Sequence, residues 1–414
     1  MSKGISLYLH VHQPYRVRPY SVFDIGEKHA YFDLKDDSKL NNEKLFHKVA
    51  EKSYWPMTAT LQKLLDQHHD FKLSLSITGD FIEQAEAWAP DLLDAFKRLV
   101  ATGRVETVAE TYYHSLAFFY DRKEFEVQVD LHRQKVHEVF GVTPTAFRNT
   151  ELAYNDELAQ WADQAGYKAI LAEGWEDVLQ WRSPNFVYQP QGTKNISLLL
   201  KNYHLSDDIA FRFGDQSWNE FPLTADKYTS WVNSSAEGPL VNLFMDFETF
   251  GEHQWAETGI FGFFEEFVGK WLSQGGTFYT VTGAAKAIET SGELSMPNTV
   301  TWADSERDLS AWVGNAIQQE SLRYIYDLAG DVVRSHDEEL IRDWRLLQSS
   351  DHFYYMATKW EHDGDVHKYF SPYDSPYDAF LYYMNAIRDV RLRLMHYHRL
   401  GGLNPTHATE KDAV

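Results

Sequence analysis

Short strand patterns alternate with helical patterns through most of the chain, and this alternation limits the fold more than any other feature. It is clearest in 5–12, where Ile5, Leu7, Leu9 and Val11 alternate with polar residues. Further strands are predicted at 73–78, 105–110, 146–151, 169–173, 196–201, 240–247 and 278–281. Helical patterns separate most of these strands, and such alternation is typical of a parallel β/α fold.

The polar residues at the strand ends favour a barrel over an open sheet. A doubly wound sheet has one crevice for its site, whereas a barrel gathers all of its strand ends around one mouth. We therefore predict a closed or nearly closed parallel barrel. The candidate functional residues at or near five strand ends are His10, His12, Glu106, Glu110, Glu151, Glu173 and Asp246.

Helical spacing of apolar residues fills the segments between the strands and takes over after Pro297. We predict a barrel domain over 1–297, a helical C-terminal domain over 298–400 and a frayed tail over 401–414. The polar segment 13–42 has the character of a long loop at the rim of a site. The predicted helices are 43–69, with Pro56 kinking or dividing it, 85–101, 124–140, 155–165, 259–273, 308–333, 337–348 and 376–400.

Composition excludes several classes of function. The net charge of −22 argues against a nucleic-acid partner and against an anionic membrane surface. The absence of cysteine excludes disulfides, thiolate zinc sites and a cysteine nucleophile. We expect a cytoplasmic protein, since neither a signal segment nor an apolar run of about 18 residues is present. The aromatic content of 15% suits a cleft that stacks ring faces, although most of these side chains are expected in the core.

The stretch 240–255 is the strongest candidate for chemistry. One face of its strand is apolar throughout, as expected for a strand backed by helices, and the other face becomes acidic only at Asp246 and Glu248. Parallel β/α folds place their active sites at this carboxyl end. Taken alone, the two acids could equally be solvated loop residues.

Glu151 and Asp246 form the natural pair of carboxylates. Glycosidic bond cleavage needs one carboxylate that attacks or stabilises the sugar cation and one acid that protonates the leaving oxygen. Glu151 also has a simpler interpretation, as an acid favoured by the dipole at a helix N-terminus.

His10 and His12 point the same way from the end of the first predicted strand. Two histidines at this spacing suit a metal-dependent hydrolase, in which Asp246 would be a further ligand or the base. Histidines that hydrogen-bond a substrate hydroxyl would have the same spacing. The pattern leaves both interpretations open.

Five segments in order along the chain resemble the characteristic regions of glycoside hydrolase family 57. The ordered set is specific, whereas His-Gln-Pro alone would be weak. The segments are His10-Val11-His12-Gln13-Pro14, Gly103-Arg104-Val105-Glu106, the strand ending at Glu151, Met245-Asp246-Phe247-Glu248-Thr249-Phe250-Gly251-Glu252-His253, and Ser350-Asp351-His352-Phe353-Tyr354-Tyr355-Met356.

This resemblance implies an incomplete seven-stranded (β/α)7 barrel of the TIM type, followed by a helical domain. It implies a retaining enzyme acting on α-glucans, with Glu151 as nucleophile and Asp246 as general acid/base, and no metal or other cofactor. The residues expected to contact substrate are His10, His12, Glu106, His253, Trp255, Asp351 and Tyr354. Phe147-Arg148-Asn149-Thr150, where the family often has Trp, and Phe247-Glu248 after the acid resemble its amylase-like branch more than the glucanotransferases.

The alternatives are a 4-α-glucanotransferase or another α-glycosidase on the same machinery, a zinc-dependent deacetylase or amidohydrolase, and a non-catalytic sugar-binding protein. Linkage, chain-length preference and oligomeric state are open. For the retaining mechanism we expect the ionised Glu151 and a low-dielectric site to raise the pKa of Asp246, so that Asp246 begins the reaction protonated.

Overall fold

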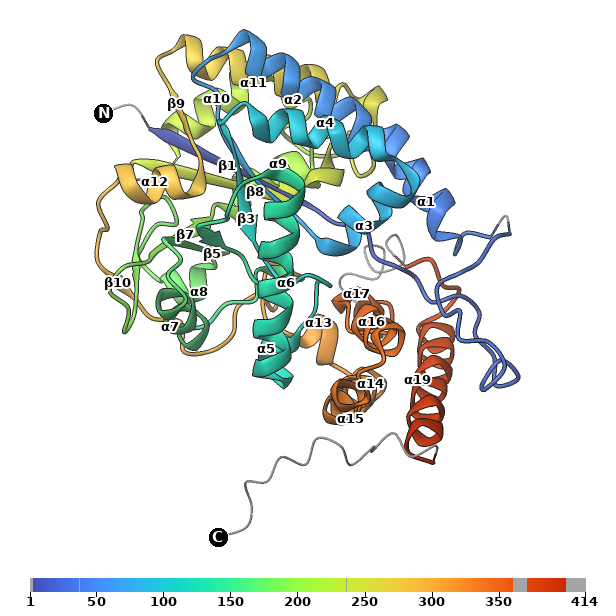
Figure 1. Ribbon diagram of the computed structural model, residues 1–414. Helices are drawn as coiled ribbons and strands as arrows, with labels where there is room; N and C mark the ends of the chain where they lie inside the picture. The colour runs from blue at the N-terminus through green and yellow to red at the C-terminus, as the bar shows by residue number, and fades with distance from the viewer. Residues whose placement is uncertain (1–2, 37, 236, 360–370, 400–414) are drawn as a thin grey trace. The chain divides into compact units, whose positions relative to one another are not determined.

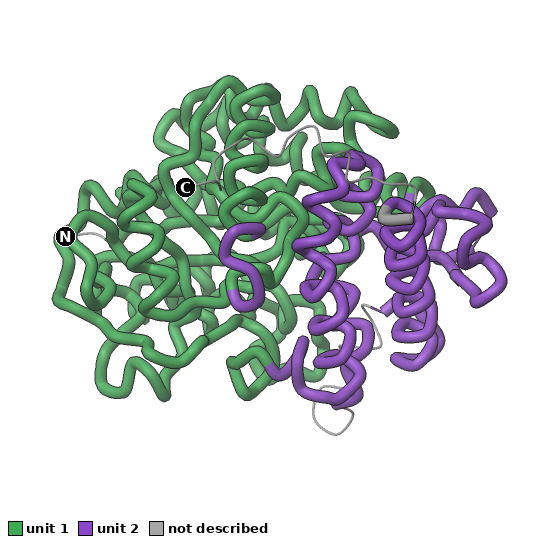
Figure 2. Tube along the Cα trace, turned by 60° about the horizontal axis from the view of Figure 1, so that its bottom comes forward, with its two compact units in different colours: residues 1–14, 43–118, 125–309 green, residues 15–42, 119–124, 310–414 purple. Residues whose placement is uncertain are grey.

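A computed structural model describes residues 3–36, 38–235, 237–359 and 371–399. The chain divides into two compact units (Figure 2), which are described separately. Unit 1 comprises 1–14, 43–118 and 125–309, and unit 2 comprises 15–42, 119–124 and 310–414. The division into domains at 297 and 400 remains a prediction, and the predicted tail 401–414 lies outside the described residues.

Unit 1 is a nearly closed barrel of seven parallel strands (Figure 1), which confirms the predicted fold class. The neighbours in order are β7 (Ser197–Lys201), β5 (Ala169–Glu173), β4 (Ala146–Phe147), β3 (Val105–Ala109), β2 (Leu73–Ile77), β1 (Gly4–Val11) and β8 (Leu240–Asp246). A short strand, β9 (Thr277–Tyr279), pairs with the first residues of β1. A separate two-stranded sheet joins β6 (Gln189–Pro190) to β10 (Glu293–Leu294).

The barrel is incomplete between its end strands β7 and β8. There the Asn242 side-chain amide donates to the Leu200 carbonyl over 2.8 Å, and the Asn202 N–H donates to the Asn242 carbonyl over 2.9 Å. Asn242 is fully buried on the polar face of its strand. Its amide therefore satisfies backbone groups at the seam that a continuous ladder would otherwise pair.

Strand alternation separates two apolar layers. Ile5, Leu7 and Leu9 of β1 pack in the large cluster formed with the surrounding helices. Tyr8 of the same strand belongs to a smaller cluster with Phe244 of β8 and with residues of β3, β4, β5 and β7. This second cluster fills the barrel interior. The polar side chains that follow on the same strand faces therefore lie above a packed layer of apolar residues.

The helices largely match the predicted positions, but two of those predicted before residue 297 are divided. A π-helical turn (Ala50–Tyr54) separates α1 from α2, so the chain continues helically up to Pro56, which stands in the first turn of α2. Pro90 begins α4 after a break at Ala89. The helices of this part are α1 (Asn42–Val49), α2 (Trp55–Gln67), α3 (Gly79–Trp88), α4 (Pro90–Ala101), α5 (Ala117–Tyr120), α6 (Arg122–Phe140), α7 (Asp156–Gln164), α8 (Glu176–Leu179), α9 (Tyr203–Ala210), α10 (Ala225–Ser234), α11 (Ile260–Ser273) and α12 (Val281–Ala287).

Unit 2 is helical, and the loop 15–42 belongs to it. The buried Asp389 carboxylate accepts hydrogen bonds from the Gly26 N–H over 2.6 Å and the Tyr31 hydroxyl over 2.5 Å, which ties this loop to the last helix. The predicted helix 308–333 is three shorter ones. The helices are α13 (Ser310–Val313), α14 (Ala316–Asp327), α15 (Ala329–Ser335), α16 (Glu338–Leu346), α17 (Ser350–Tyr354) and α19 (Pro376–Arg399). Within the described part of the chain, every helix is too short or too polar to cross a bilayer.

Candidate active site

Strand register brings His10 and Asp246 together. The two residues are direct partners at the carboxyl ends of the parallel strands β1 and β8. Nδ1 of His10 lies 3.6 Å from the Asp246 carboxylate, whose side chain is 39% exposed. His10 itself is buried, so Asp246 is the half of this pair that faces solvent.

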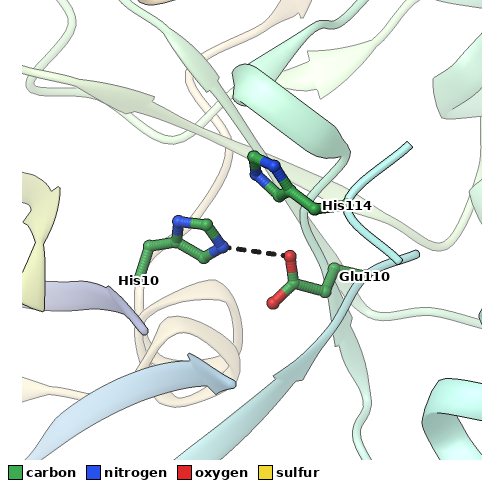
Figure 3. A group of neighbouring side chains, drawn as sticks. All are labelled: His10, Glu110 and His114. Carbon is green, nitrogen blue, oxygen red and sulfur yellow. Dashed lines mark hydrogen bonds and ion pairs between the residues drawn. The ribbon is translucent and has the colours of Figure 1, made fainter. Parts of the chain in front are cut away.

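A second carboxylate holds the other edge of the His10 ring. Glu110 follows β3 directly, and its carboxylate lies 3.1 Å from Nε2 of His10 (Figure 3). Burial and the Arg148 charge lower the pKa of His10, but the two carboxylates outweigh them and raise it to about 9. His10 is therefore an imidazolium at neutral pH, and it donates one N–H toward Glu110 and the other toward Asp246.

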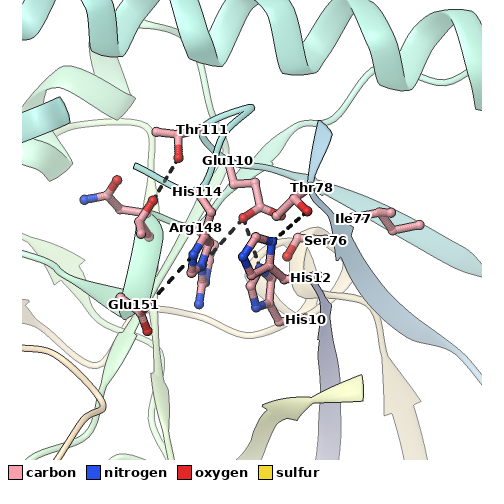
Figure 4. Close-up of polar contacts among 12 residues, drawn as sticks. His10, His12, Ser76, Ile77, Thr78, Glu110, Thr111, His114, Arg148 and Glu151 are labelled. Atoms are coloured by element: carbon pink, nitrogen blue, oxygen red, sulfur yellow. Dashed lines mark hydrogen bonds and ion pairs between the residues drawn. The ribbon is translucent and has the colours of Figure 1, made fainter. Parts of the chain in front are cut away.

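Three histidine rings stack at the mouth of the barrel (Figure 4). The ring of His114 lies 4.9 Å from that of His10 and 4.1 Å from that of His12, centre to centre. His12 is fixed by a 2.9 Å hydrogen bond between its Nδ1 and the Thr78 hydroxyl. His114 has a φ of 49°, a left-handed conformation that aims its ring at the two others.

The same cluster contains donor atoms that could ligate a metal, so we tested whether they fit one. One atom each from His10, Glu110 and His114 lie within 4.8 Å of one another. However, Nη1 of the buried Arg148 lies 3.2 Å from Nε2 of His114 and 3.5 Å from the Glu110 carboxylate. A guanidinium carries a permanent positive charge, so these atoms already surround a cation. The set does not fit an added divalent ion.

Glu151 reaches the cluster from the turn after β4. Its backbone has φ 60° and ψ 24°, which interrupts the short 3₁₀ turn Thr150–Leu152. A glutamate in this region is uncommon and costs about 1–3 kcal/mol, a feature that concentrates at functional sites. One carboxylate oxygen lies 3.8 Å from Nδ1 of His114, and the other accepts a 2.9 Å hydrogen bond from the indole N–H of Trp302.

Trp302 is itself held on several sides. Two cations lie close to its indole ring, with the Arg148 guanidinium carbon 5.0 Å and the Lys201 ammonium 5.7 Å from the ring centre. Its carbonyl accepts a 2.7 Å hydrogen bond from Arg307, which also donates to the buried Glu173 over 2.9 Å. The N–H that reaches Glu151 therefore has a fixed direction, and fixed donors stabilise charge without reorganisation.

The expected pKa of Asp246 is wrong for the free protein. Burial raises it, but the hydrogen bond and charge of His10, with smaller effects of His253 and Arg148, lower it below the ordinary value. The raised group is instead Glu248, whose pKa burial and the Asp246 charge bring to about 8. Glu248 is buried and accepts a 2.5 Å hydrogen bond from the Tyr54 hydroxyl. The site thus holds an ionised Asp246 close in sequence to a protonated Glu248.

The turn after β8 supports these acids. Gly251 has a φ of 110°, and a Cβ there would lie 1.9 Å from the Lys52 carbonyl oxygen. No side chain fits this position, so glycine is required for the chain to turn back. The N–H groups of Glu252 and His253 then donate to the Glu248 carbonyl over 3.2 and 3.0 Å.

Glu106 lies apart from this group. It is the second residue of β3, near the amino end of the strand, where its carboxylate accepts bonds from the Ser74 hydroxyl over 2.8 Å and the Thr282 N–H over 3.1 Å. There it caps the first turn of α12. Its predicted contact with substrate has no support from this position, and Glu110, four residues later, is the acid at the carboxyl end.

The other predicted substrate contacts have different surroundings. His253 follows the Glu248 turn, and burial lowers its pKa. Trp255 is 57% exposed, with the Lys52 ammonium 5.6 Å from its ring centre. Asp351 and Tyr354 lie on α17 in unit 2. The substrate-binding roles of these four residues remain predictions.

Comparison with known proteins identifies the family. The model of glycosyl hydrolase family 57 matches residues 6–297 of this chain. The chain belongs to this family. A protein of Methanocaldococcus jannaschii named "Putative alpha-amylase" is 41% identical to it over 401 residues, which are 93% of this chain and 83% of the relative.

Two solved structures have the same fold, and the first is described as a family 57 enzyme. A branching enzyme of Thermococcus kodakaraensis aligns with a TM-score of 0.71 at 14% identity, over 97% of this chain and 92% of the other. The α-amylase AmyC of Thermotoga maritima aligns with a TM-score of 0.62 at 14% identity, over 98% of this chain and 95% of the other. At these identities the likeness concerns the fold alone.

Sequence reasoning missed three residues that lie next to Glu151 and His10 in the structure. His114 follows a short loop after β3, Arg148 follows β4, and Trp302 comes 151 residues after Glu151. Arg148 could have been identified from the sequence, since a lone arginine at the end of a barrel strand near the candidate acid Glu151 needs a buried partner. His114 and Trp302 stand outside the strands, so alternation could not place them.

Proposed function

We propose that this protein is a retaining glycoside hydrolase that cleaves α-1,4-linked glucans, with Glu151 as nucleophile and Asp246 as general acid/base. The observation that carries the proposal is the bridge of histidines between the two carboxylates. Glu151 lies beside His114, His114 stacks on His10, and His10 pairs with Asp246. Membership of family 57 and the similarity to a protein named as an α-amylase support the substrate class.

In the first step Glu151 attacks the anomeric carbon of the bound sugar. A Glu151 oxygen forms an ester bond to that carbon as the glycosidic C–O bond breaks. The leaving oxygen takes a proton from Asp246, so the departing sugar is released as an alcohol. The Trp302 N–H keeps the attacking carboxylate aimed while it becomes a neutral ester, and the negative charge ends on Asp246, which has given up its proton.

Asp246 must gain a proton before it can act as an acid. In the free protein the His10 imidazolium keeps it ionised. Its side chain is 39% exposed, and a glucan ring above it would remove that water. Loss of water raises a carboxyl pKa, so substrate binding itself favours the protonated form. The adjacent Glu248, with a pKa of about 8, does not compete as a charged group at neutral pH.

In the second step water cleaves the ester on Glu151. Asp246, now ionised again, removes a proton from the water molecule as the water oxygen attacks the anomeric carbon. The ester C–O bond breaks and returns the electron pair to Glu151. Two displacements at one carbon restore the starting configuration, so the product is an α-sugar.

The test of the proposed function is a product analysis on chelator-treated protein. We expect a linear malto-oligosaccharide to give shorter chains only, with the α-anomer formed first in a proton NMR time course. Longer chains beside shorter ones would assign the protein as a transferase on the same machinery. Loss of activity that returns only with added zinc would overturn the metal-free mechanism.

Trp302→Phe is expected to lower kcat by about tenfold to a hundredfold with little change in KM, because one fixed hydrogen-bond donor to a reacting carboxylate is lost. Phenylalanine keeps an aromatic ring close to Arg148 and Lys201. Steady-state kinetics on a malto-oligosaccharide test this, with Trp55→Phe, at the exposed first residue of α2, as the matched substitution. An unchanged kcat would mean that Trp302 does not position Glu151.

A further inference from the structure

An open groove of about 1050 Å³ lies at the carboxyl ends of β5 and β7, beside the seam between β7 and β8. Its lining comes from the loop after β5, from α9 and the loop that follows it, and from α10. Asn202, which bonds to Asn242 across the seam, is part of the lining. Glu151, Asp246 and Trp302 are not among its described lining residues, whereas Gly174 and Asn202, which directly follow β5 and β7, are.

Aromatic side chains form the walls of this groove. Trp181 is 84% exposed, which is unusual for the largest apolar side chain. Trp218 and Trp231 pack edge to face with their ring centres 5.9 Å apart. Tyr203 completes the set, and its ring centre lies 4.0 Å from that of His204. The exposed ring of Trp181 and the half-buried rings of Tyr203, Trp218 and Trp231 each present part of a flat apolar face to water.

Polar side chains also lie among the lining residues of this groove. The Glu176 carboxylate lies 2.7 Å from Nε2 of His204, and the Asp208 carboxylate lies 2.7 Å from Nε of Arg212. At the base of the groove, the buried Asn202 amide donates to the Asn185 amide oxygen over 2.9 Å. Carboxylate and amide oxygens of this kind can accept hydrogen bonds from the hydroxyl groups of a ligand.

We infer that this groove is a second binding site for a neutral glucan chain, distinct from the active site. A pyranose ring has an apolar C–H face that stacks on an indole and hydroxyl edges that pair with carboxylates and amides. Ligand sites for drug-sized molecules occupy about 300–1,000 Å³, so the volume suits several linked sugars better than one. The choice of an α-glucan as the ligand rests on the proposed function, whereas the groove and its lining are observed in the structure independently of that function.

Trp181 is the residue on which to test the groove. Its exposure means that alanine there removes a stacking surface without opening the core. Tyr203 is a poorer choice, because the Arg307 guanidinium carbon lies 4.6 Å from its ring centre and Arg307 also holds Trp302. A change at Tyr203 could therefore alter Glu151 indirectly. Phe23, 88% exposed and outside the groove lining, provides the matched control Phe23→Ala.

The experiment compares binding to a polymer with cleavage of a short substrate. Native gels containing amylose measure binding, with each change placed in a Glu151→Gln background so that the gel glucan is not digested. We expect Trp181→Ala to weaken this binding about tenfold, as for the loss of one stacked ring, and Phe23→Ala to leave it unchanged. In otherwise wild-type protein, Trp181→Ala should cleave maltotetraose at the normal rate, because the catalytic residues are untouched.

The possible failures are distinguishable. If wild type cleaves maltotetraose but Trp181→Ala retains full affinity for amylose, the groove does not bind glucan and the proposed function stands. If Trp181→Ala loses affinity and maltotetraose turnover in proportion, Trp181 belongs to the active site and the second site is wrong. If the parent protein neither binds amylose nor cleaves maltotetraose, the proposed function is wrong and the ligand assigned to the groove fails with it.

Discussion

Glu151→Gln is expected to reduce cleavage of malto-oligosaccharides by at least about a thousandfold, because an amide cannot form the glycosyl ester on which the first step depends. Gln is close in size to Glu and still accepts the 2.9 Å hydrogen bond from Trp302. The fold and sugar binding should therefore persist. Turnover and binding of maltoheptaose, measured on the same preparation, separate loss of chemistry from loss of affinity.

Glu157→Gln is the matched control, since Glu157 is an exposed acid in the first turn of the neighbouring helix α7. It should keep normal turnover. The role of Glu151 is tested further with Glu151→Ala, a malto-oligosaccharide bearing an aryl leaving group, and azide. Azide would enter from the face that Glu151 vacates and give a β-glycosyl azide. Near-normal turnover of Glu151→Gln, or an α-azide from Glu151→Ala, would assign the nucleophile to another residue.

The barrel and the placement of His10 and Asp246 at its mouth could be predicted from the sequence because both depend on strand alternation. Ile5, Leu7 and Leu9 indicate which face of β1 packs on helices, and His10 must then lie on the other face. The same rule applied to β8 gives Asp246. Local pattern suffices here, since each side chain is positioned by its own strand.

Glu106 shows that a family motif alone does not identify which acid lies at the carboxyl end of a strand. Four residues separate it from Glu110, and both the predicted strand 105–110 and the observed β3 place Glu106 near the amino end and Glu110 at the carboxyl end. Alternation puts both on one face of the strand, so it cannot choose between them. The end of a strand is the least certain part of its prediction, and here it decides which acid meets His10.

The charge states at the site were beyond the sequence for a different reason. The pKa of Asp246 depends on His10, which depends in turn on Glu110, and Glu110 lies beside Arg148. These residues come from four strands, so the sign of the shift follows from a three-dimensional arrangement of charges. A prediction that counted only Glu151 and burial left out the cation in direct contact with Asp246.

Asp246→Asn is expected to slow cleavage of unactivated glucans by about a hundredfold to ten-thousandfold, the range for loss of a general acid/base. Its effect should depend on the leaving group. An aryl malto-oligosaccharide needs no proton to depart, so the first step should survive and release a burst of the phenol. The second step then lacks its base, and the glycosyl ester on Glu151 should accumulate. Peptide mass spectrometry after a rapid acid quench would locate the ester.

Glu248→Gln is the sharpest control for Asp246→Asn, because it makes the same change two residues away. The pKa of Glu248 is about 8, so its side chain is already neutral near pH 7, and Gln retains an oxygen that accepts from the Tyr54 hydroxyl. Turnover should therefore change little. If Glu248→Gln instead lost activity on unactivated glucans while Asp246→Asn kept it, the protonated Glu248 would be the acid. Azide again distinguishes the two cases. Of Asp246→Ala and Glu248→Ala, only the variant that lacks the true acid/base should yield an α-glycosyl azide.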